Sequence, residues 1–364
     1  MKISKKNIEN KKILLAPLDW GLGHATRCIP LIQLFLHQNV EVIVCCNPIL
    51  SSLLKTEFPD ITVLDLKGYN IKYSKEKRWF LMKIIAQLPK LFKAVNFERR
   101  WLSKVIETHQ IDGVISDNRL GFYSKKKPSV FITHQLQIKT GNGFIDKVIQ
   151  KINYHFINHF DECWVPDMAN SPNFAGELSH PKLLPKTPVK YLGLVSRFKK
   201  IALPKKYSLA IVLSGPEPQR SIFENIIINQ LKYFSEPVVL IRGLPNDNEL
   251  LKLPFSNVSQ FNHLNADSLN EILQQSEMVI TRSGYSTVMD LIKIQQKAIL
   301  IPTPGQTEQE YLSEYLHKNQ LFYSVQQNNF ILKECLQKAS EFVFQKINTA
   351  DLNEAVLTEW LKKI

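Results

Sequence analysis

Short runs of apolar residues recur along the chain, and longer stretches with helical spacing lie between them. In the first half these runs are Lys12–Pro17, Val40–Cys46, Ile61–Leu66, Gly113–Ser116, Ser129–Thr133 and Glu162–Val165. Strands that are apolar throughout, without alternation, are typical of a parallel sheet covered by helices on both faces. The pattern therefore predicts an α/β unit with a parallel sheet at the start of the chain.

The pattern is interrupted and then begins again. Residues 170–206 are polar and proline-rich, with one strand-like run at Val189–Leu192. The later apolar runs are Leu209–Leu213, Val238–Ile241, Val258–Phe261, Met278–Thr281 and Ala298–Ile301, and two helices are expected at Ile331–Gln345 and about Thr349–Lys363. A chain of 364 residues suits two α/β domains better than one. We predict an N-terminal domain over residues 1–195, a linker over 196–206, a C-terminal domain over 207–345 and a C-terminal helix over 346–364.

Composition excludes several other classes of protein. The sequence has no run of about 18 apolar residues, so no membrane span is expected. Its basic first residues are not followed by the apolar core of a secretory signal, which makes a cytoplasmic location the default expectation. The five cysteines show no CxxC spacing and are expected to be reduced core residues, with neither a disulfide nor a zinc framework.

Charge is distributed unevenly along the chain. Residues 1–195 contain 28 Lys and Arg against 16 Asp and Glu, whereas residues 196–364 contain 18 against 17. Nearly all of the formal net charge of +13 therefore belongs to the N-terminal half. This asymmetry predicts that an acidic partner meets that half.

The stretch from Lys67 to Lys104 concentrates this charge. It has 11 Lys and Arg residues against two acids, interleaved with apolar side chains such as Trp79 and Phe80. Cations beside an apolar stripe suit docking on an anionic membrane surface, here the inner face of the plasma membrane. An ordinary amphipathic helix with a lysine-rich solvent face is the alternative. Nucleic acid is not expected as a partner, because no recognised nucleic-acid module is present.

A possible ligand site lies in the second half. The strand-like Met278–Thr281 is followed by a tight turn at Ser283 and Gly284, and a helix opens near Ser286 and Thr287. A small-residue turn at a helix start leaves backbone N–H groups free and places the positive end of the helix dipole there. Such a turn is suited to a diphosphate.

Polar residues suited to the ribose and then to the sugar of a ligand follow this turn along the sequence. Asp290 falls one turn into the helix, where its carboxylate can accept hydrogen bonds from a vicinal diol such as a ribose. Gln309 and Glu310 lie at the next helix start, near Glu308, and offer groups suited to sugar hydroxyls. Phosphate, ribose and sugar in that order indicate a nucleotide sugar.

A second candidate site is the loop after the first strand. Gly21 and Gly23 form a GxG turn that lets a ligand approach the backbone, but no third glycine completes a dinucleotide fingerprint, so NAD binding is not expected. The turn presents His24 at a helix N-terminus, where the dipole favours a neutral imidazole able to accept a proton from an attacking hydroxyl. Asp19, in the same loop, is the competing base. A His24 ring that only caps backbone groups is the structural alternative.

Other predicted strands also end in polar residues. Asp117 ends the strand at Gly113–Ser116, and His134 and Gln135 follow the strand at Ser129–Thr133. Because ligands bind at the carboxyl ends of parallel strands, Asp117 is a candidate to orient the acceptor or to assist His24. Either position is also consistent with a simple loop cap.

The donor-side residues resemble a known family. Arg282-Ser283-Gly284, Thr287, Asp290 and the Gln309-Glu310 pair resemble the donor-binding half of family-28, MurG-like glycosyltransferases, which are inverting enzymes with two Rossmann-like domains facing a cleft (GT-B type). In that family a Glu commonly holds the ribose, and the matching Asp290 is one methylene shorter. The family's Gln-Gln pair stands here as Gln309-Glu310. The first loop resembles the family's GGxGGH loop, with His24 at the histidine position.

The loop at residues 214–220 matches this family only in part. A GGSQG-like loop meets the diphosphate there in the family, whereas this chain keeps Gly215 and Arg220 but has prolines at 216 and 218. Since proline has no N–H to donate, Arg220 is expected to supply the charge that stabilises the leaving diphosphate. No DxD sequence and no His/Cys cluster occur, so neither a metal nor another cofactor is expected.

We therefore expect an α/β, GT-B-type, metal-independent inverting glycosyltransferase. The resemblance implies that it moves a sugar, such as an N-acetylhexosamine, from a UDP-linked donor to a lipid-linked or other glycan acceptor of the cell envelope, and that the last helix crosses back to the N-terminal domain. The residues expected to hold phosphate are Gly215, Arg220, Ser283, Gly284 and Thr287, and Arg282 and Ser286 are also expected to bind the donor. The base stays open between His24, Asp19 and Asp117. A nucleotide-sugar epimerase of the same fold and a non-catalytic nucleotide- or lipid-binding protein are the alternatives.

Overall fold

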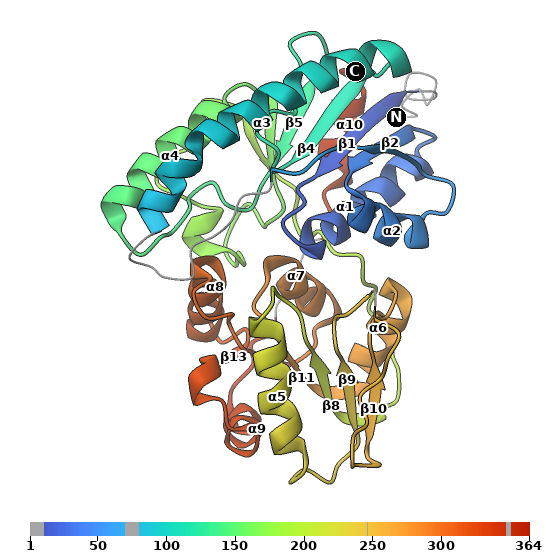
Figure 1. Ribbon diagram of the computed structural model, residues 1–364, viewed down its shortest axis with the longest axis vertical. Helices are drawn as coiled ribbons and strands as arrows, with labels where there is room; N and C mark the ends of the chain where they lie inside the picture. Colours follow the sequence, from blue (N-terminus) through green and yellow to red (C-terminus); the bar gives the residue numbers. More distant parts are fainter. Residues whose placement is uncertain (1–10, 70–79, 246, 347–350) are drawn as a thin grey trace. The chain divides into compact units, whose positions relative to one another are not determined.

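The chain forms two compact units. In the computed structural model, which describes residues 11–69, 80–245, 247–346 and 351–364, one unit comprises residues 1–195 with 350–364 and the other comprises residues 196–349 (Figure 1).

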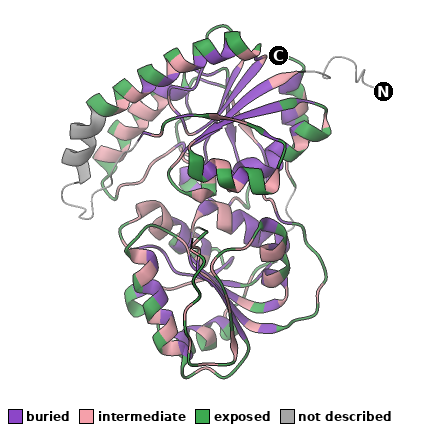
Figure 2. Ribbon diagram, turned by 45° about the vertical axis from the view of Figure 1, so that its right-hand side comes forward, coloured by how far each residue is buried: buried purple, intermediate pink, exposed green. Residues whose placement is uncertain are grey.

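The first unit is built on a sheet of seven strands. These are β1 (Lys12–Pro17), β2 (Glu41–Cys46), β3 (Thr62–Asp65), β4 (Gly113–Asp117), β5 (Ser129–Ile132), β6 (Glu162–Val165) and β7 (Val189–Tyr191). They lie in the order β3-β2-β1-β4-β5-β6-β7, and every described pairing is parallel. The central strands are buried on both faces, which explains why the sequence shows continuous apolar runs there (Figure 2).

Helices connect these strands. They are α1 (Leu22–His37), α2 (Pro48–Glu57), α3 (Phe80–His109) and α4 (Gly143–Ile157), with the short 3₁₀ helix η3 at Gly176–Leu178. Local sequence sets several of their starts. Asn47 caps α2 by accepting a hydrogen bond from the backbone N–H of Leu50 at 2.9 Å, and Asn142 caps α4 in the same way through Phe144 at 3.0 Å.

The C-terminal helix α10 (Glu354–Leu361) packs into the core of this first unit. The indole ring of Trp360 lies edge-on to that of Trp164, with 5.6 Å between ring centroids, and 6.4 Å from the ring of Phe35. The chain thus returns to its first unit at the end, as the family resemblance implied. The helix is shorter than the predicted Thr349–Lys363 because it begins only at Glu354.

The second unit repeats the architecture with six strands. They are β8 (Tyr207–Val212), β9 (Val238–Ile241), β10 (Val258–Phe261), β11 (Ser276–Thr281), β12 (Ala298–Leu300) and β13 (Tyr323–Ser324), in the order β10-β9-β8-β11-β12-β13. Its helices are α5 (Gln219–Leu231), α6 (Ala266–Gln274), α7 (Tyr285–Ile294), α8 (Thr307–Lys318) and α9 (Leu332–Glu341), with η4 at Gln327–Asn329. All described pairings in this sheet are parallel as well.

Two elements differ from the sequence-based prediction. The two-residue strand β13 was not predicted, because a run of that length leaves no hydrophobic pattern. The helix predicted at Ile331–Gln345 ends at Glu341, since the backbone of Phe342 is extended and its ring packs against His317 and Tyr323, with centroids 5.1 and 5.7 Å away.

Both sheets have a doubly wound strand order. Successive strands are added towards one edge of the sheet and then, from one position on, towards the other edge, and this position is called the switch point. The switch point falls between β1 and β4 in the first unit and between β8 and β11 in the second. Ligands of open α/β sheets bind outside the carboxyl ends of the strands at such a point. The fold class expected from the sequence is therefore confirmed. The candidate residues follow these four strands and the neighbouring strands β5 and β12.

Candidate functional site

In the first unit the switch point brings the loop after β1 against the end of β4. Pro17 pairs with Asp117 in the parallel ladder, and the backbone N–H of Leu18 donates to the carbonyl oxygen of Asp117 at 3.0 Å. Gly21 then adopts a φ of +113°, a value that favours glycine, and α1 begins at the next residue. This sharp start places His24 in the first turn of α1, beside the end of β4.

His24 and Asp117 form a buried pair. The imidazole Nδ1 lies 3.0 Å from Oδ2 of Asp117; the His24 side chain is 17% exposed and that of Asp117 is 0% exposed. Burial alone would raise the pKa of Asp117, but the nearby Arg27 guanidinium and His24 outweigh it, and the pKa lies below its ordinary value. An ionised Asp117 that accepts the Nδ1 proton leaves Nε2 of His24 as a proton acceptor.

Arg27 completes this cluster. Its Nη2 donates to Oδ1 of Asp117 and also lies 2.9 Å from Nδ1 of His24. Because a guanidinium can only donate, Arg27 and a protonated Nδ1 both direct their hydrogens at the carboxylate. Nη1 of Arg27 lies 2.8 Å from Nδ1 of His134, which accepts a hydrogen bond from the guanidinium in the tautomer whose proton is on Nε2. The predicted residues His24, Asp117 and His134 thus lie together, tied by one arginine.

The sequence analysis missed Arg27 as a functional residue. The sequence feature that could have identified it is its spacing, because Arg27 follows His24 by three residues and so lies on the same face of α1. Arg27 is 5% exposed, and its Nε has no hydrogen-bond partner among the described residues. A buried guanidinium with three polar neighbours fixes their positions before any ligand arrives.

Asp19, the competing base, lies in different surroundings. A Cβ atom built on Gly68 would lie 1.5 Å from Oδ2 of Asp19, so the carboxylate packs directly on the glycine backbone. Its other oxygen, Oδ1, is buried and has no hydrogen-bond partner within the described part of the chain. Asp19 stays a candidate base, with one oxygen available to a ligand hydroxyl.

In the second unit the candidate donor residues surround the ends of β8, β11 and β12. Gly215 has a φ of +100°, which favours glycine, and a Cβ built there would lie 3.4 Å from Oγ1 of Thr303. Ser283 donates through Oγ to the carbonyl oxygen of Gln309 at 2.8 Å. Gly284 is the N-cap of α7, whose first turn carries Ser286 and Thr287. The structure therefore brings together loops that are far apart in the sequence.

Thr303 was not among the predicted site residues. Its Oγ1 is buried and has no hydrogen-bond partner in the described residues, although it lies beside Gly215. A polar side chain directly after β12, between Pro302 and Pro304, was the available signal. A buried hydroxyl without a partner at the end of a strand is suited to a ligand oxygen.

Gln309 and Glu310 both bond to their own loop. Oε1 of Gln309 accepts from the backbone N–H of Thr303 at 3.0 Å, and Oε1 of Glu310 accepts from that of Gly305 at 3.0 Å. These contacts shape the turn between β12 and α8. Contact of either side chain with a sugar stays a prediction.

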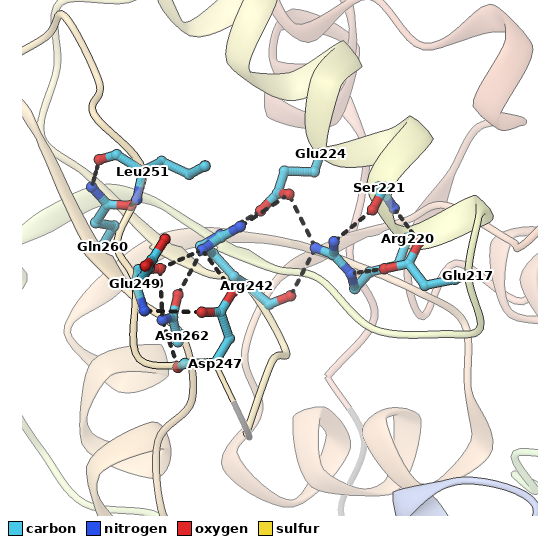
Figure 3. A network of polar contacts seen from close by, with 10 residues as sticks. All are labelled: Glu217, Arg220, Ser221, Glu224, Arg242, Asp247, Glu249, Leu251, Gln260 and Asn262. Atoms are coloured by element: carbon cyan, nitrogen blue, oxygen red, sulfur yellow. Dashed lines mark hydrogen bonds and ion pairs between the residues drawn. The ribbon is translucent and has the colours of Figure 1, made fainter.

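Arg220, the predicted diphosphate ligand, belongs to a network of internal ion pairs (Figure 3). Its Nε donates to Glu217 at 2.6 Å, Nη2 donates to Ser221 at 2.7 Å, and Nη1 lies 3.1 Å from Glu224. Glu224 in turn accepts from Nε of Arg242 at 2.7 Å. Two carboxylates of the chain itself, those of Glu217 and Glu224, thus hold Arg220 at the start of α5, and a phosphate would have to share or displace these contacts.

Arg282 is a positioning residue in this geometry. Its guanidinium is 1% exposed and donates to Oε1 of Gln327 at 2.7 Å and to the carbonyl oxygen of Gln219 at 3.0 Å. It also stacks 4.5 Å above the ring of Phe223. Burial lowers the pKa of Arg282 to about 10. Direct phosphate contact by Arg282 stays a prediction, whereas its hold on the start of α5 is visible.

Asp290, the predicted ribose ligand, also has internal partners. Oγ of Ser196 donates to its Oδ1 at 2.6 Å, and Nε of Arg197 lies 3.5 Å from Oδ2. Burial raises the pKa of Asp290, against the opposing effect of Arg197. A ribose would share or displace these contacts, so the role of Asp290 stays a prediction.

Part of the basic stretch can be placed. Lys72, Lys75, Lys77, Arg78 and Trp79 lie outside the described residues, and Lys83 is described in its backbone alone. Farther along α3, Phe92 and Phe97 are exposed large hydrophobic side chains beside the exposed Lys90 and Lys93. None of the described helices is long and apolar enough to cross a membrane.

Comparison with known proteins finds similarity to glycosyltransferases. Residues 222–358 match the glycosyltransferase family 28 C-terminal domain. An uncharacterised glycosyltransferase of Methanopyrus kandleri is 21% identical over 320 residues, which cover 82% of this chain and 88% of that protein. The UDP-N-acetylglucosamine–N-acetylmuramyl-(pentapeptide) pyrophosphoryl-undecaprenol N-acetylglucosamine transferase of Buchnera aphidicola is 28% identical over 142 residues, 37% of this chain and 39% of that one. The crystal structure of the kitacinnamycin glycosyltransferase superposes with a TM-score of 0.63 at 15% identity, covering 98% and 94% of the two chains.

Proposed function

We propose that this chain, a glycosyltransferase of the GT-B fold whose residues 222–358 match the family 28 C-terminal domain, transfers a sugar from a UDP-linked donor to a lipid-linked glycan acceptor, with inversion and without a metal. His24 acts as the base in this proposal. The observation that carries it is the buried His24–Asp117 pair at the switch point of the first unit.

The chemistry follows from that pair. Nε2 of His24 removes the proton from the acceptor hydroxyl as the hydroxyl oxygen attacks the anomeric carbon. The bond from that carbon to the diphosphate breaks on the opposite face, so one displacement inverts the anomeric configuration. Asp117, ionised and 3.0 Å from Nδ1, stabilises the imidazolium that forms. Asp19 is the reserve, because its Oδ1 is buried without a partner among the described residues.

The donor is assigned to the second unit. Gly215, Ser283, Gly284 and Thr287 surround the ends of β8 and β11, and the dipole of α7 favours an anion at its N-terminus. The named transferase of Buchnera aphidicola uses UDP-N-acetylglucosamine, which supports UDP as the nucleotide and an N-acetylhexosamine as the sugar. Asp290 would hold the ribose, and Gln309 with Glu310 the sugar.

The acceptor is assigned to the first unit. That half of the chain carries most of the positive charge, and α3 presents exposed Phe92 and Phe97 beside Lys90 and Lys93. These features support peripheral binding at an anionic membrane surface, such as the inner face of the plasma membrane.

A melting scan against UDP, GDP, TDP and ADP, each with and without magnesium, tests the donor assignment. A nucleotide present at about 100 times its Kd stabilises the native state by about 2.7 kcal/mol. A shift with UDP and UDP-sugars that magnesium does not change is expected. A shift confined to another nucleotide, or one that requires magnesium, would refute this part of the proposal. Release of free sugar or UDP with no acceptor present would instead favour the epimerase alternative.

A further inference from the structure

We propose that Arg242 positions the loop that meets the nucleoside of the donor. Arg242 directly follows β9, and it holds the loop of residues 243–251 against Asn262, which directly follows β10. Binding of a nucleotide by the second unit is taken from the proposed function, whereas the role of Arg242 goes beyond it. Arg242 is a positioning residue, since it would act on the nucleoside through this loop and through Asn262.

Contacts inside the second unit indicate where the nucleoside would lie. In the sheet, β9 and β10 are on one side of β8, and β12, which precedes the residues assigned to the sugar, is on the other. Asp290, assigned to the ribose, accepts from Oγ of Ser196 at 2.6 Å. Three residues later, the carbonyl oxygen of Lys199 accepts from Nδ2 of Asn270 at 2.9 Å. Asn270 lies on α6, the helix after β10, so a nucleoside that extends from this ribose away from the sugar would point towards β9 and β10.

The side chain of Arg242 ties three parts of the second unit together (Figure 3). Its Nε donates to Oε1 of Glu224 on α5 at 2.7 Å. Its Nη1 donates to Oδ1 of Asn262 at 2.8 Å and to the carbonyl oxygen of Glu249 at 3.0 Å. Arg242 is 6% exposed. Because a guanidinium presents several donors in fixed directions, this one group sets α5, the loop after β9 and the end of β10 relative to one another.

Asn262 completes the attachment of the loop. Its Nδ2 donates to the carbonyl oxygen of Asp247 at 2.7 Å and to that of Glu249 at 3.0 Å. Its own carbonyl oxygen accepts from the backbone N–H of Leu244 at 2.7 Å. The described residues of the loop 243–251 are therefore bonded to the end of β10 at several points, and this loop forms a wall on the nucleoside side of the sheet.

This wall adjoins the loop assigned to the diphosphate. Gly243 has a φ of +71°, and a Cβ built there would lie 2.3 Å from the carbonyl oxygen of Leu213, the residue before the loop 214–220. Only a glycine lets the chain pass so close to that carbonyl. In addition, Nη1 of Arg220 donates to the carbonyl oxygen of Arg242 at 3.3 Å. A nucleotide whose diphosphate meets the loop 214–220 would thus have the loop after β9 beside its nucleoside.

Holding this loop in advance lowers the cost of binding a nucleoside. A loop that is already bonded to β10 does not have to be ordered when the ligand arrives, whereas a loose loop pays this entropy from the binding energy. R242K tests the effect with little risk to folding, because a lysine keeps a positive charge opposite the buried Glu224. Its ammonium group lacks the planar fork that reaches Glu224, Asn262 and Glu249 at once.

Two asparagines at opposite ends of β10 supply a matched control. Asn257 directly precedes β10, and its Nδ2 donates to the carbonyl oxygens of Phe234 and Glu236, both at 2.8 Å. N257A and N262A each remove two such bonds to backbone carbonyls from the same strand. Both should lower the melting temperature, but only N262A removes bonds at the carboxyl end, where ligands of open α/β sheets bind.

Hydrogen exchange of the wild-type chain, measured peptide by peptide, shows which part of the nucleotide meets the loop. UDP should slow the exchange of backbone amides in residues 243–251, and inorganic pyrophosphate should leave their exchange unchanged. Protection of this loop by pyrophosphate to the same extent would mean that the diphosphate is what contacts it, and would overturn the assignment to the nucleoside. The absence of protection by bound UDP would overturn it as well.

Calorimetric titration of the folded variants with UDP measures the contribution of Arg242. R242K and N262A should raise the Kd of UDP about tenfold, whereas N257A should change it by less than about twofold. A merely structural role would give N257A and N262A equal losses of affinity at equal losses of melting temperature, and that result would refute the proposal. An unchanged Kd in both R242K and N262A would refute it too.

The same titrations separate this inference from the proposed function. If the wild-type chain binds UDP but neither variant changes the Kd, the role of Arg242 is refuted and the transferase proposal stands. If the wild-type chain binds none of UDP, GDP, TDP and ADP, the donor assignment fails, and the role of Arg242 fails with it.

Discussion

Replacing Asp117 with Asn tests the proposed base most directly, because the substitution removes one charge and keeps the shape of the side chain. Asp117 is 0% exposed and accepts hydrogen bonds from His24 and Arg27 through different oxygens. An amide has only one accepting oxygen, so its NH₂ group must face either Nη2 of Arg27 or Nδ1 of His24. If the NH₂ group faces Nη2 of Arg27, two hydrogen-bond donors face each other. If it faces Nδ1 of His24, Nδ1 must accept, the ring proton moves to Nε2, and Nε2 can no longer take a proton from the acceptor hydroxyl.

The expected effect on turnover is large. A positioned general base contributes about 10²- to 10⁴-fold to a rate, and we expect kcat of D117N to fall within this range. That range corresponds to about 3–5 kcal/mol in the activation barrier. The same variant leaves the buried Arg27 without its carboxylate, a type of loss that costs about 3–5 kcal/mol of stability. Turnover must therefore be measured at a temperature where melting scans show the variant to be folded.

The assay follows sugar transfer at saturating donor, with the UDP melting shift as a control for the second unit. D19N is the matched variant, since it makes the same chemical change at the competing base. We expect D117N to lose turnover and keep the UDP shift, with D19N less affected. Turnover of folded D117N within about threefold of wild type, or a larger loss in D19N, would refute the assignment of His24 with Asp117.

Four further predictions follow from particular contacts. A Cβ at Gly68 would lie 1.5 Å from Asp19 Oδ2, so G68A should turn that carboxylate away. The variant should lower kcat/KM for the acceptor by about 10- to 100-fold with little change in melting temperature, and unchanged kinetics would contradict this prediction. E217Q should weaken the internal hold on Arg220 and raise UDP affinity by about tenfold in a titration, whereas weaker binding would mean that Glu217 orders the loop for the donor. W360A should lower the free energy of unfolding by about 3–5 kcal/mol in urea, because Trp360 is 1% exposed in the core of the first unit; a loss under about 1 kcal/mol would contradict that packing. The lowered pKa of Asp117 should add stability that is fully present above the unfolded-state value of about 3.9 and is lost as pH falls through the lower folded value, so unfolding curves of wild type and D117N should converge below about pH 4.

Much of the fold could be predicted because the strands are buried on both faces. A strand such as Val238–Ile241, with every residue buried, leaves a continuous apolar run that can be recognised without any tertiary information. The parallel order follows from the alternation of these runs with helices. The strand β13 was not predicted because two half-buried residues show no hydrophobic periodicity. Its pairing with β12 is visible only in the folded sheet.

The positions of the site residues were predictable, but their partners were not. His24, Asp117 and His134 follow strands that end at one edge of the sheet, and this alone places them near one another. Arg27 contacts a residue 107 positions away in the sequence, and no local sequence pattern indicates such a contact. The same holds for Asp290, whose spacing on α7 suggested a ribose, whereas only the folded unit shows that Ser196 and Arg197 bond to its carboxylate.

The charged side chains at the two switch points are paired in different ways. In the first unit the buried Asp117 and Arg27 leave Nε2 of His24 able to accept a proton, so the ion pair is already formed at the atom to which the proposed mechanism moves a proton. In the second unit Arg220 is bound by the chain's own carboxylates, and Arg282 is buried under other loops. In the proposed donor site a diphosphate would meet the N-terminus of α7 and hydroxyl groups such as that of Thr303, and it would reach Arg220 by displacing Glu217. Because that exchange replaces one anion on Arg220 with another, its net gain is small in the ground state and grows as the leaving diphosphate acquires charge. If Arg220 meets the leaving diphosphate, Glu217 holds this arginine until the transition state, and replacing Glu217 should therefore tighten UDP binding.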